Sequence, residues 1–249
     1  MNLKVISFNI LCADAANGNS IIERAPRIRA VVAPLDADLI GFQEATPAWL
    51  ELLERDYGEA YEIYNVYRGR NSHESTPIAW KRERFACLDK GTLWLSDTPE
   101  VESPGWDERY GFPRIFTWAR LKEKNSGTEF CLINTHFGFG DHCQTKSAQI
   151  LLSFIRRAGC PCVVTGDFNM EMDSAGYQVM TEYLADVNAQ TVNDLSPTYH
   201  GFDSGGAGEH IDYCFVTRQI RPLFFRIISD LPDGRYPSDH YGIFASLSV

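Results

Sequence analysis

The hydrophobic pattern of the chain switches repeatedly between strand-like runs and helix-like stretches. Residues 3–10 and 38–44 are short, mostly apolar runs, which predict buried strands. Residues 23–35, between them, repeat apolar positions every three or four residues, which predicts a helix. The same criteria predict further helices at residues 47–57, 145–157 and 174–184, and further strands at residues 63–66, 77–81, 91–95, 115–121, 129–136, 162–168, 211–217, 223–228 and 241–249.

The order strand, helix, strand occurs twice, over residues 3–44 and over residues 129–169. In each copy, both apolar strands stop at polar residues. Ligands of open sheets bind beyond the carboxyl ends of the strands, so two such units packed face to face would bring these polar ends to one rim. The polar residues at the four ends are Asn9, Gln43 and Glu44, Asn134 to His136, and Asp167 and Asn169.

The residues at these ends, together with two later segments, offer the chemistry of a metal-assisted reaction. Each of them alone also fits an ordinary turn or strand end. Carboxylate oxygens suit Mg²⁺ or Mn²⁺, and a histidine beside an acid suits proton transfer. The candidates are the acids Glu44, Asp167, Asp212 and Asp239, the amides Asn9 and Asn169, and the histidines His136 and His240.

These positions lie in short strings that resemble the ordered motifs of the endonuclease/exonuclease/phosphatase superfamily. The strings are Ser7-Phe8-Asn9-Ile10, Gly41-Phe42-Gln43-Glu44, Asn134-Thr135-His136, Gly166-Asp167-Phe168-Asn169, His210-Ile211-Asp212-Tyr213 and Ser238-Asp239-His240. Residues 91–99 and 113–120 are similar to a compact bacterial subgroup of metal-dependent hydrolases with deadenylase-like and nocturnin-like relatives. The resemblance implies an α/β fold with four layers (α/β/β/α), in which two mixed sheets pack face to face with helices outside. We expect residues 1–249 to form one domain.

The resemblance also implies roles for individual residues. Glu44 is the expected principal ligand of Mg²⁺ or Mn²⁺, assisted by Asn9 and Asp239. Asp167 is expected to orient or deprotonate the attacking water, and Asn169 to position the phosphate.

The remaining roles concern proton transfer and phosphate binding. We predict that Asp212 hydrogen-bonds His240, because an acid on the second ring nitrogen fixes the tautomer and orientation of a catalytic histidine. His240 would then contact the phosphate or activate water, and His136 would stabilise charge on the phosphoryl oxygens. Arg114 is expected to reach the phosphate as a planar, bidentate donor.

Two loops depart from the family pattern or border the expected site. Relatives usually carry an Asp-His pair directly after the motif that ends in His136, whereas here Phe137 to Gly140 intervene before Asp141. We expect the loop Gly138 to Asp141 to border the substrate. Glu74 resembles an acidic position of the bacterial subgroup near the site, although an ordinary loop glutamate is an equal alternative. The glycine-rich residues 201–209 predict a rim loop.

The net charge of the chain limits the class of substrate that we expect. The formal net charge is -10 and the pI is near 5.1, whereas a general nucleic-acid binder needs a basic footprint. We therefore expect a small or short phosphate ester as the substrate. The alternative is a nuclease, either a deadenylase-like exonuclease or a DNA-repair endonuclease, and it would need a basic strip beside the site. The best local cluster for such a strip is Arg68, Arg70, Lys81, Arg82 and Arg84, with Tyr67, Tyr110 and Phe112 available to stack bases. A binding module without activity is a third class, against which the complete set of acids and histidines argues.

The cysteines and the apolar stretches of the chain indicate the cellular environment that we expect. The chain has seven cysteines at irregular spacing, which we interpret as reduced thiols, with Cys131, Cys162 and Cys214 in apolar runs. No apolar stretch approaches the ~18 residues that a membrane span needs, and residues 1–9 resemble a strand and not a signal peptide. We expect a soluble, cytoplasmic protein that acts as a monomer.

Overall fold

The structure is a computed structural model that describes residues 1–202 and 208–249. Its helices are α1 (Ile21–Val32), α2 (Pro47–Tyr57), α3 (Asp141–Ala158) and α4 (Ala175–Tyr183), with short 3-10 turns η1 (Ala33–Leu35) and η2 (Pro232–Gly234). Its strands are β1 (Asn2–Asn9), β2 (Leu39–Gln43), β3 (Tyr61–Tyr64), β4 (Tyr67–Gly69), β5 (Ser72–Ser75), β6 (Ile78–Lys81), β7 (Phe85–Trp94), β8 (Ile115–Glu123), β9 (Glu129–His136), β10 (Cys162–Asp167), β11 (Leu184–Asp186), β12 (Asp212–Thr217), β13 (Arg221–Ile228) and β14 (Gly242–Ser248).

The strands form two mixed sheets and a small hairpin. The first sheet has the order β13-β14-β1-β2-β6-β3, and the second has the order β11-β12-β10-β9-β8-β7. Each sheet contains one parallel pair, β1 with β2 and β10 with β9, and all other pairings are antiparallel. The two parallel pairs are the strand-helix-strand units that the sequence predicts, because α1 joins the first pair and α3 joins the second.

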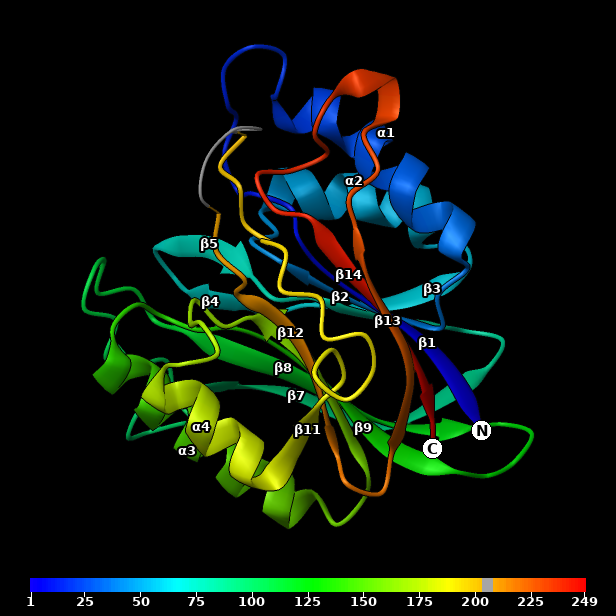
Figure 1. The fold of residues 1–249 in the computed structure, drawn as a ribbon, viewed down its shortest axis with the longest axis vertical. Helices are drawn as coiled ribbons and strands as arrows, with labels where there is room; N and C mark the ends of the chain where they lie inside the picture. Colours follow the sequence, from blue (N-terminus) through cyan, green and yellow to red (C-terminus); the bar gives the residue numbers. More distant parts are fainter. Residues whose placement is uncertain (203–207) are drawn as a thin grey trace.

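The sheets face each other with helices outside, so the predicted four-layer arrangement is confirmed. Figure 1 shows α1 and α2 covering one sheet while α3 and α4 cover the other. One buried apolar cluster draws on both sheets, with Val5, Leu39 and Trp80 from the first and Leu132 and Val163 from the second. Two further clusters lie under the helices, one beneath α1 and α2 and one beneath α3 and α4. The prediction of one domain over residues 1–249 stays a prediction.

Most predicted elements are present, and the differences have local causes. α3 begins at Asp141 and not at 145, since Gly140 adopts a φ of +94° that only glycine takes readily and so breaks the chain just before the helix. The hairpin β4–β5 and the strand β11 were not predicted, because strands of three or four residues carry too short a pattern. The expected rim loop at 201–209 lies partly outside the described residues.

A layer of buried polar side chains joins the two sheets just below the carboxyl ends of β1, β2, β9 and β10. Asn134 on β9 donates from Nδ2 to the carbonyl oxygens of Phe42 (2.7 Å) and Pro77 (3.1 Å) in the facing sheet. Its Oδ1 accepts from Gln43 Nε2 at 2.6 Å and from Thr165 Oγ1 at 3.0 Å. The motif that contains Asn134 therefore supplies a structural bridge as well as a site residue.

Gly41 makes room for this bridge. A Cβ at Gly41 would lie 2.5 Å from Asn134 Oδ1 and 2.5 Å from Thr165 Oγ1, which is closer than real Cβ contacts. Only glycine lets the two sheets approach this closely at that point.

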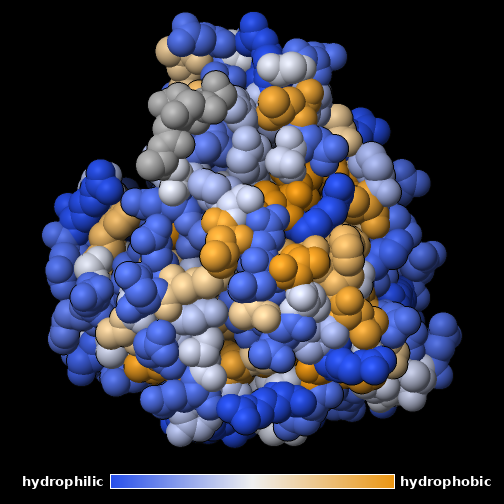
Figure 2. Space-filling model, viewed as in Figure 1, coloured by the Kyte–Doolittle hydropathy of each residue, from blue (hydrophilic) through white to orange (hydrophobic). Residues whose placement is uncertain are grey.

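Three further features concern the surface, the cysteines and the hydrophobicity of the helices. Figure 2 shows separate hydrophobic patches on a mainly hydrophilic face. All seven cysteines are free thiols, and Cys131, Cys162 and Cys214 are buried, as predicted. Among the described residues, no helix combines the length and the hydrophobicity needed to cross a bilayer.

We predict that Asn134→Ala lowers the free energy of unfolding by about 2 to 4 kcal/mol, because several buried polar groups lose a partner and each such loss costs roughly 1–3 kcal/mol. Urea denaturation followed by circular dichroism measures the change. Asn125→Ala, at an exposed position, is the matched control and should change stability by less than about 0.5 kcal/mol. Equal stability of the two variants would contradict the role of the bridge.

Candidate active site

A pocket of about 540 Å³ opens at the carboxyl ends of β1, β2, β9 and β10. The size suits a small-molecule site. Most of the predicted site residues line this pocket, and Asn9 and Asp212 contact residues that do. The predicted residues that line it are Glu44, Glu74, Arg114, His136, Asp167, Asn169, Asp239 and His240.

Glu44 lies at the end of β2 in a backbone conformation of φ +63°, which few residues other than glycine adopt. Its Oε1 accepts from Asn9 Nδ2 at 3.0 Å and its Oε2 from the Cys12 N–H at 2.9 Å. Burial opposes the charge of Glu44, but these hydrogen bonds outweigh it and lower the pKa of the carboxyl. Glu44 is therefore held as a carboxylate that faces the pocket.

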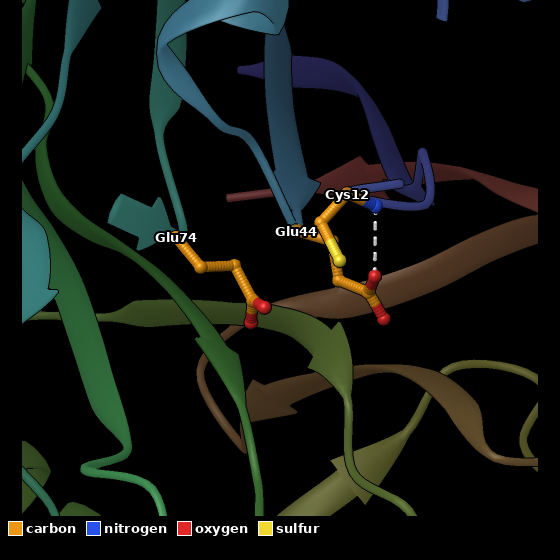
Figure 3. Close-up of side chains that lie close together, drawn as sticks. All are labelled: Cys12, Glu44 and Glu74. Carbon is orange, nitrogen blue, oxygen red and sulfur yellow. Dashed lines mark hydrogen bonds between the residues drawn. The ribbon is translucent and has the colours of Figure 1, made fainter. Parts of the chain in front are cut away.

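Other acids surround the Glu44 carboxylate. Figure 3 shows Glu74 from β5 turned toward the space beside Glu44, with the Cys12 thiol close by, and their ligand atoms all lie within 4.8 Å of one another. Asp239 also lines the pocket, and its pKa is raised by burial and by the charge of Glu44. Carboxylates that repel one another in a shared space fit a divalent cation between them.

Asp167, at the end of β10, connects the two halves of the site. Its Oδ2 accepts from Asn9 Nδ2 at 2.9 Å and lies 3.5 Å from His136 Nε2 and 3.7 Å from His240 Nε2. Its Oδ1 accepts from the Asn169 N–H at 2.9 Å. Burial and the nearby charge of Asp212 raise the pKa of Asp167 to about 7, which is the range of a group that takes up a proton near neutral pH.

The predicted hydrogen bond between His240 and Asp212 is present, at 2.9 Å between Nδ1 and Oδ2. Burial opposes protonation of the ring, but Asp212, Asp167 and Asp239 outweigh it and raise the pKa of His240 to about 10. The Tyr199 ring packs against the imidazole at 4.9 Å between centroids. His240 is thus a buried, oriented imidazolium whose Nε2 faces Asp167.

Two buried arginines, Arg68 and Arg114, lie in the same pocket as His136. Burial and the charges of Arg114 and Arg68 lower the pKa of His136 well below its usual value, so this ring is neutral. Arg114 donates from Nε and Nη2 to Asp107 Oδ2 at 2.9 Å, while its Nη1 is buried with no partner among the described residues. Arg68 pairs with Glu74. Arg114 lines the pocket and so offers a positive charge to an anionic group there.

Several residues of this site could not be predicted from the sequence. Cys12, Arg109 and Tyr199, which line the pocket, and Asp107, which binds Arg114, lie in loops without periodicity or motif, and no signal in a single sequence marks them. The loop Gly138 to Asp141 borders the pocket as expected, through Phe139.

The basic strip proposed for a nuclease does not form. Arg84 pairs with Asp38 and Lys81 pairs with Asp36 and Asp38, at the amino end of β2 and so at the far end of the sheet from Glu44. Arg82 donates to the Gly58 carbonyl, Arg70 lies 3.8 Å from the Glu102 carboxylate, and Arg68 is occupied by Glu74. The sequence clusters these cations, but alternation along the strands and local acids disperse them.

The chain is similar in sequence and in structure to known proteins. A sequence model described as the Endonuclease/Exonuclease/phosphatase family matches residues 6–240. A family protein from Bacteroides vulgatus is 28% identical with a TM-score of 0.92, covering 100% of this chain and 99% of its own. A mannosyl-6-phosphatase from Bacteroides thetaiotaomicron is 27% identical with a TM-score of 0.88, covering 99% and 100%.

A more distant structure shares the fold. TDP2 of D. rerio, solved with a single-strand DNA product, is 20% identical with a TM-score of 0.78, covering 100% of this chain and 99% of its own. The match of the family model extends over nearly the whole length and includes every motif from the first strand to His240. The chain therefore belongs to the endonuclease/exonuclease/phosphatase family and is a hydrolase of phosphoesters.

Proposed function

We propose that this protein is a divalent-metal-dependent phosphoesterase that cleaves a phosphomonoester or phosphodiester of a small or short substrate. The observation that carries the proposal is a pocket of about 540 Å³ that is lined by Glu44, Asp167, His240 and the guanidinium-bearing Arg114. The dispersal of the basic cluster speaks against a long nucleic acid. A phosphatase among the similar structures agrees with this substrate class.

A nuclease acting on a short strand is the second candidate. Tyr110 and Phe112 are partly exposed at the pocket and are available to stack bases, as the sequence suggested. Tyr67 instead packs against His73 and does not line the pocket. The fold shared with TDP2 is compatible with this candidate but does not identify the substrate.

Glu44 and Asp239 would hold Mg²⁺ or Mn²⁺, with Asn9 beside them. The metal supplies Lewis-acid polarisation of a phosphate oxygen and stabilises the leaving oxygen. Asn9 uses its Nδ2 group on Glu44 and Asp167, and its Oδ1 accepts from the Leu11 N–H at 3.1 Å. In this geometry its first role is to keep the two carboxylates in place.

The residues of the pocket divide the work of the reaction. Arg114, His136 and Asn169 bind and orient the phosphate. Asp167, with its raised pKa, takes the proton of the attacking water. His240 stays protonated and stabilises charge that develops on the phosphoryl oxygens. Asp212 positions the His240 ring.

The proposed reaction class is tested with a panel of phosphate esters and short oligonucleotides, assayed with Mg²⁺, with Mn²⁺ and with a chelator. Hydrolysis that needs the metal and favours small esters is the expected result. Hydrolysis that persists in chelator would contradict the metal requirement. The cytoplasmic location and the monomeric state stay predictions.

We predict that Glu44→Gln raises the Mg²⁺ concentration for half-maximal activity by at least 10-fold, since the substitution keeps the shape of the side chain and removes a charged metal ligand. Calorimetric titration with Mn²⁺ measures the same loss without turnover. Glu51→Gln, an exposed acid on α2, is the matched control. Parental hydrolysis of a phosphodiester by Glu44→Gln in limiting Mg²⁺ would reject the assignment.

We predict that His240→Ala lowers kcat by roughly 10²–10³-fold, the usual loss when one group that stabilises developing charge is removed. Asp212→Asn should lose part of the same effect, and the double variant should lose far less than the product of the single losses, because the pair acts as one unit. The readouts are steady-state kinetics and circular dichroism.

Exposed His142→Ala is the matched control for this series and should keep the parental kcat. Losses that multiply strictly in the double variant would show that His240 and Asp212 act independently.

A further inference from the structure

One wall of the pocket is built from aromatic rings and a guanidinium that the proposed chemistry leaves unused. Tyr110 and Phe112 stack on each other, with centroids 5.8 Å apart and an interplanar angle of 18°. Phe139 meets Tyr110 edge to face at 5.6 Å, and Arg109 lies 5.1 Å from the Tyr110 centroid and 4.9 Å from the Phe139 centroid. We call Arg109, Tyr110, Phe112 and Phe139 the aromatic shelf.

The shelf is partly open to solvent. Tyr110 is 52% exposed and Phe112 is 42% exposed, although both are large and apolar. Within the described part of the chain, Arg109 forms no ion pair with an acid. Exposed aromatic rings that line a pocket mark a binding surface.

Buried contacts fix the shelf in place. The side chain of Asp107 is fully buried, and its Oδ1 accepts from the N–H groups of Arg109 and Tyr110, both at 3.0 Å. The Glu108 N–H donates to the Phe139 carbonyl at 3.2 Å. A Cβ at Gly138 would lie 2.9 Å from the Asp107 Cβ and 2.7 Å from Cys143 Sγ, so the loop that carries Phe139 packs tightly against this segment.

Asp107 also sets the distance from the shelf to the phosphate group. The carboxylate that holds Arg109 and Tyr110 through Oδ1 binds the Arg114 guanidinium through Oδ2. Arg114 consequently lies 5.8 Å from the Phe139 centroid. A phosphate bound to Arg114 would leave its ester group beside the shelf.

We propose that the aromatic shelf binds a flat heteroaromatic ring on the leaving group of the substrate, such as a nucleobase, so that the preferred substrates are mononucleotides or the last nucleotide of a short strand. This inference rests on the proposed phosphoesterase function. The shelf offers the exposed parts of its apolar rings, and its hydrogen-bonding groups are a phenol and the guanidinium groups of Arg109 and of Arg68, which lies 4.7 Å from the Phe112 centroid. A sugar would need several partners for its hydroxyls, whereas a base presents an apolar face and few polar edge atoms.

The test compares adenosine 5′-monophosphate with ribose 5-phosphate, which carry the same ester and differ by the base. Base stacking on aromatic side chains changes affinity by roughly 5- to 150-fold, so we expect kcat/KM for the nucleotide to be higher by a factor in this range. Calorimetry in chelator should show the same preference in Kd without any turnover.

Substitutions of the shelf residues test whether their rings cause the preference for the nucleotide over ribose 5-phosphate. The double variant Tyr110→Ala with Phe112→Ala should bring the nucleotide-to-ribose-phosphate ratio close to one, while Phe112→Trp, which keeps an aromatic face, should retain the preference. Tyr183→Ala is the matched control, because Tyr183 is 48% exposed but lies on α4 outside the active-site pocket.

Different results would refute base binding by the aromatic shelf and the proposed phosphoesterase function. A ratio near one in the parental protein, or a preference for mannose 6-phosphate over the nucleotide, would overturn the shelf while leaving the phosphoesterase intact. If no phosphate ester is hydrolysed, the proposed function fails, and the binding measured in chelator still decides the shelf. A preference that survives the double alanine variant would also overturn it.

Discussion

The two sheets meet at a fixed distance because one buried amide bridges them. Asn134 reaches from β9 to the carbonyl oxygens of the facing sheet and accepts from Gln43 and Thr165, and Gly41 leaves the space that its side chain fills. An unpaired group at this depth would be costly, so the sheets are bound to this register. Gln43 directly precedes Glu44, Asn134 lies two residues before His136, and Thr165 lies two residues before Asp167. The bridge therefore sets the spacing between groups that come from distant parts of the chain.

Above the bridge, the site holds charges of both signs at depths where a lone charge would be unfavourable. Neighbours neutralise or orient each one, as Asp212 does for His240 and Asp107 does for Arg114. Glu44 and Asn169 adopt left-handed backbone conformations, with φ of +63° and +48°, and such strain persists where the surrounding structure demands it. The hydrogen bonds that Asn9 and Cys12 donate to the Glu44 carboxylate hold Glu44 in this conformation.

The sequence predicts the layers and the strand-end residues because both follow from local pattern. Buried strands and amphipathic helices have periods that a single chain reveals, and polar residues at strand ends share a rim by topology. The partner of a side chain follows no such rule. Asp107 lies in an irregular loop, and only the fold shows that it binds Arg114. Arg68 and Arg84 are close in sequence, yet the first faces the pocket and the second pairs with Asp38 at the far end of the sheet. A charge cluster in sequence therefore did not predict a charge cluster in space.

Electrostatics links the acidic composition to the size of the substrate. Under the proposed function, a single phosphate in the pocket would lie near Arg114 and protonated His240, at contact range where screening by salt is weak. The further phosphates of a long strand would lie outside this pocket, facing a protein of net charge -10. At ~0.1 M ionic strength the screening length is ~10 Å, so phosphates close to the surface would still experience that repulsion. Under the proposed function, a pocket that holds one phosphate would therefore disfavour a polyanion, and apolar contacts would be the main means of recognising the group to which the phosphate is attached.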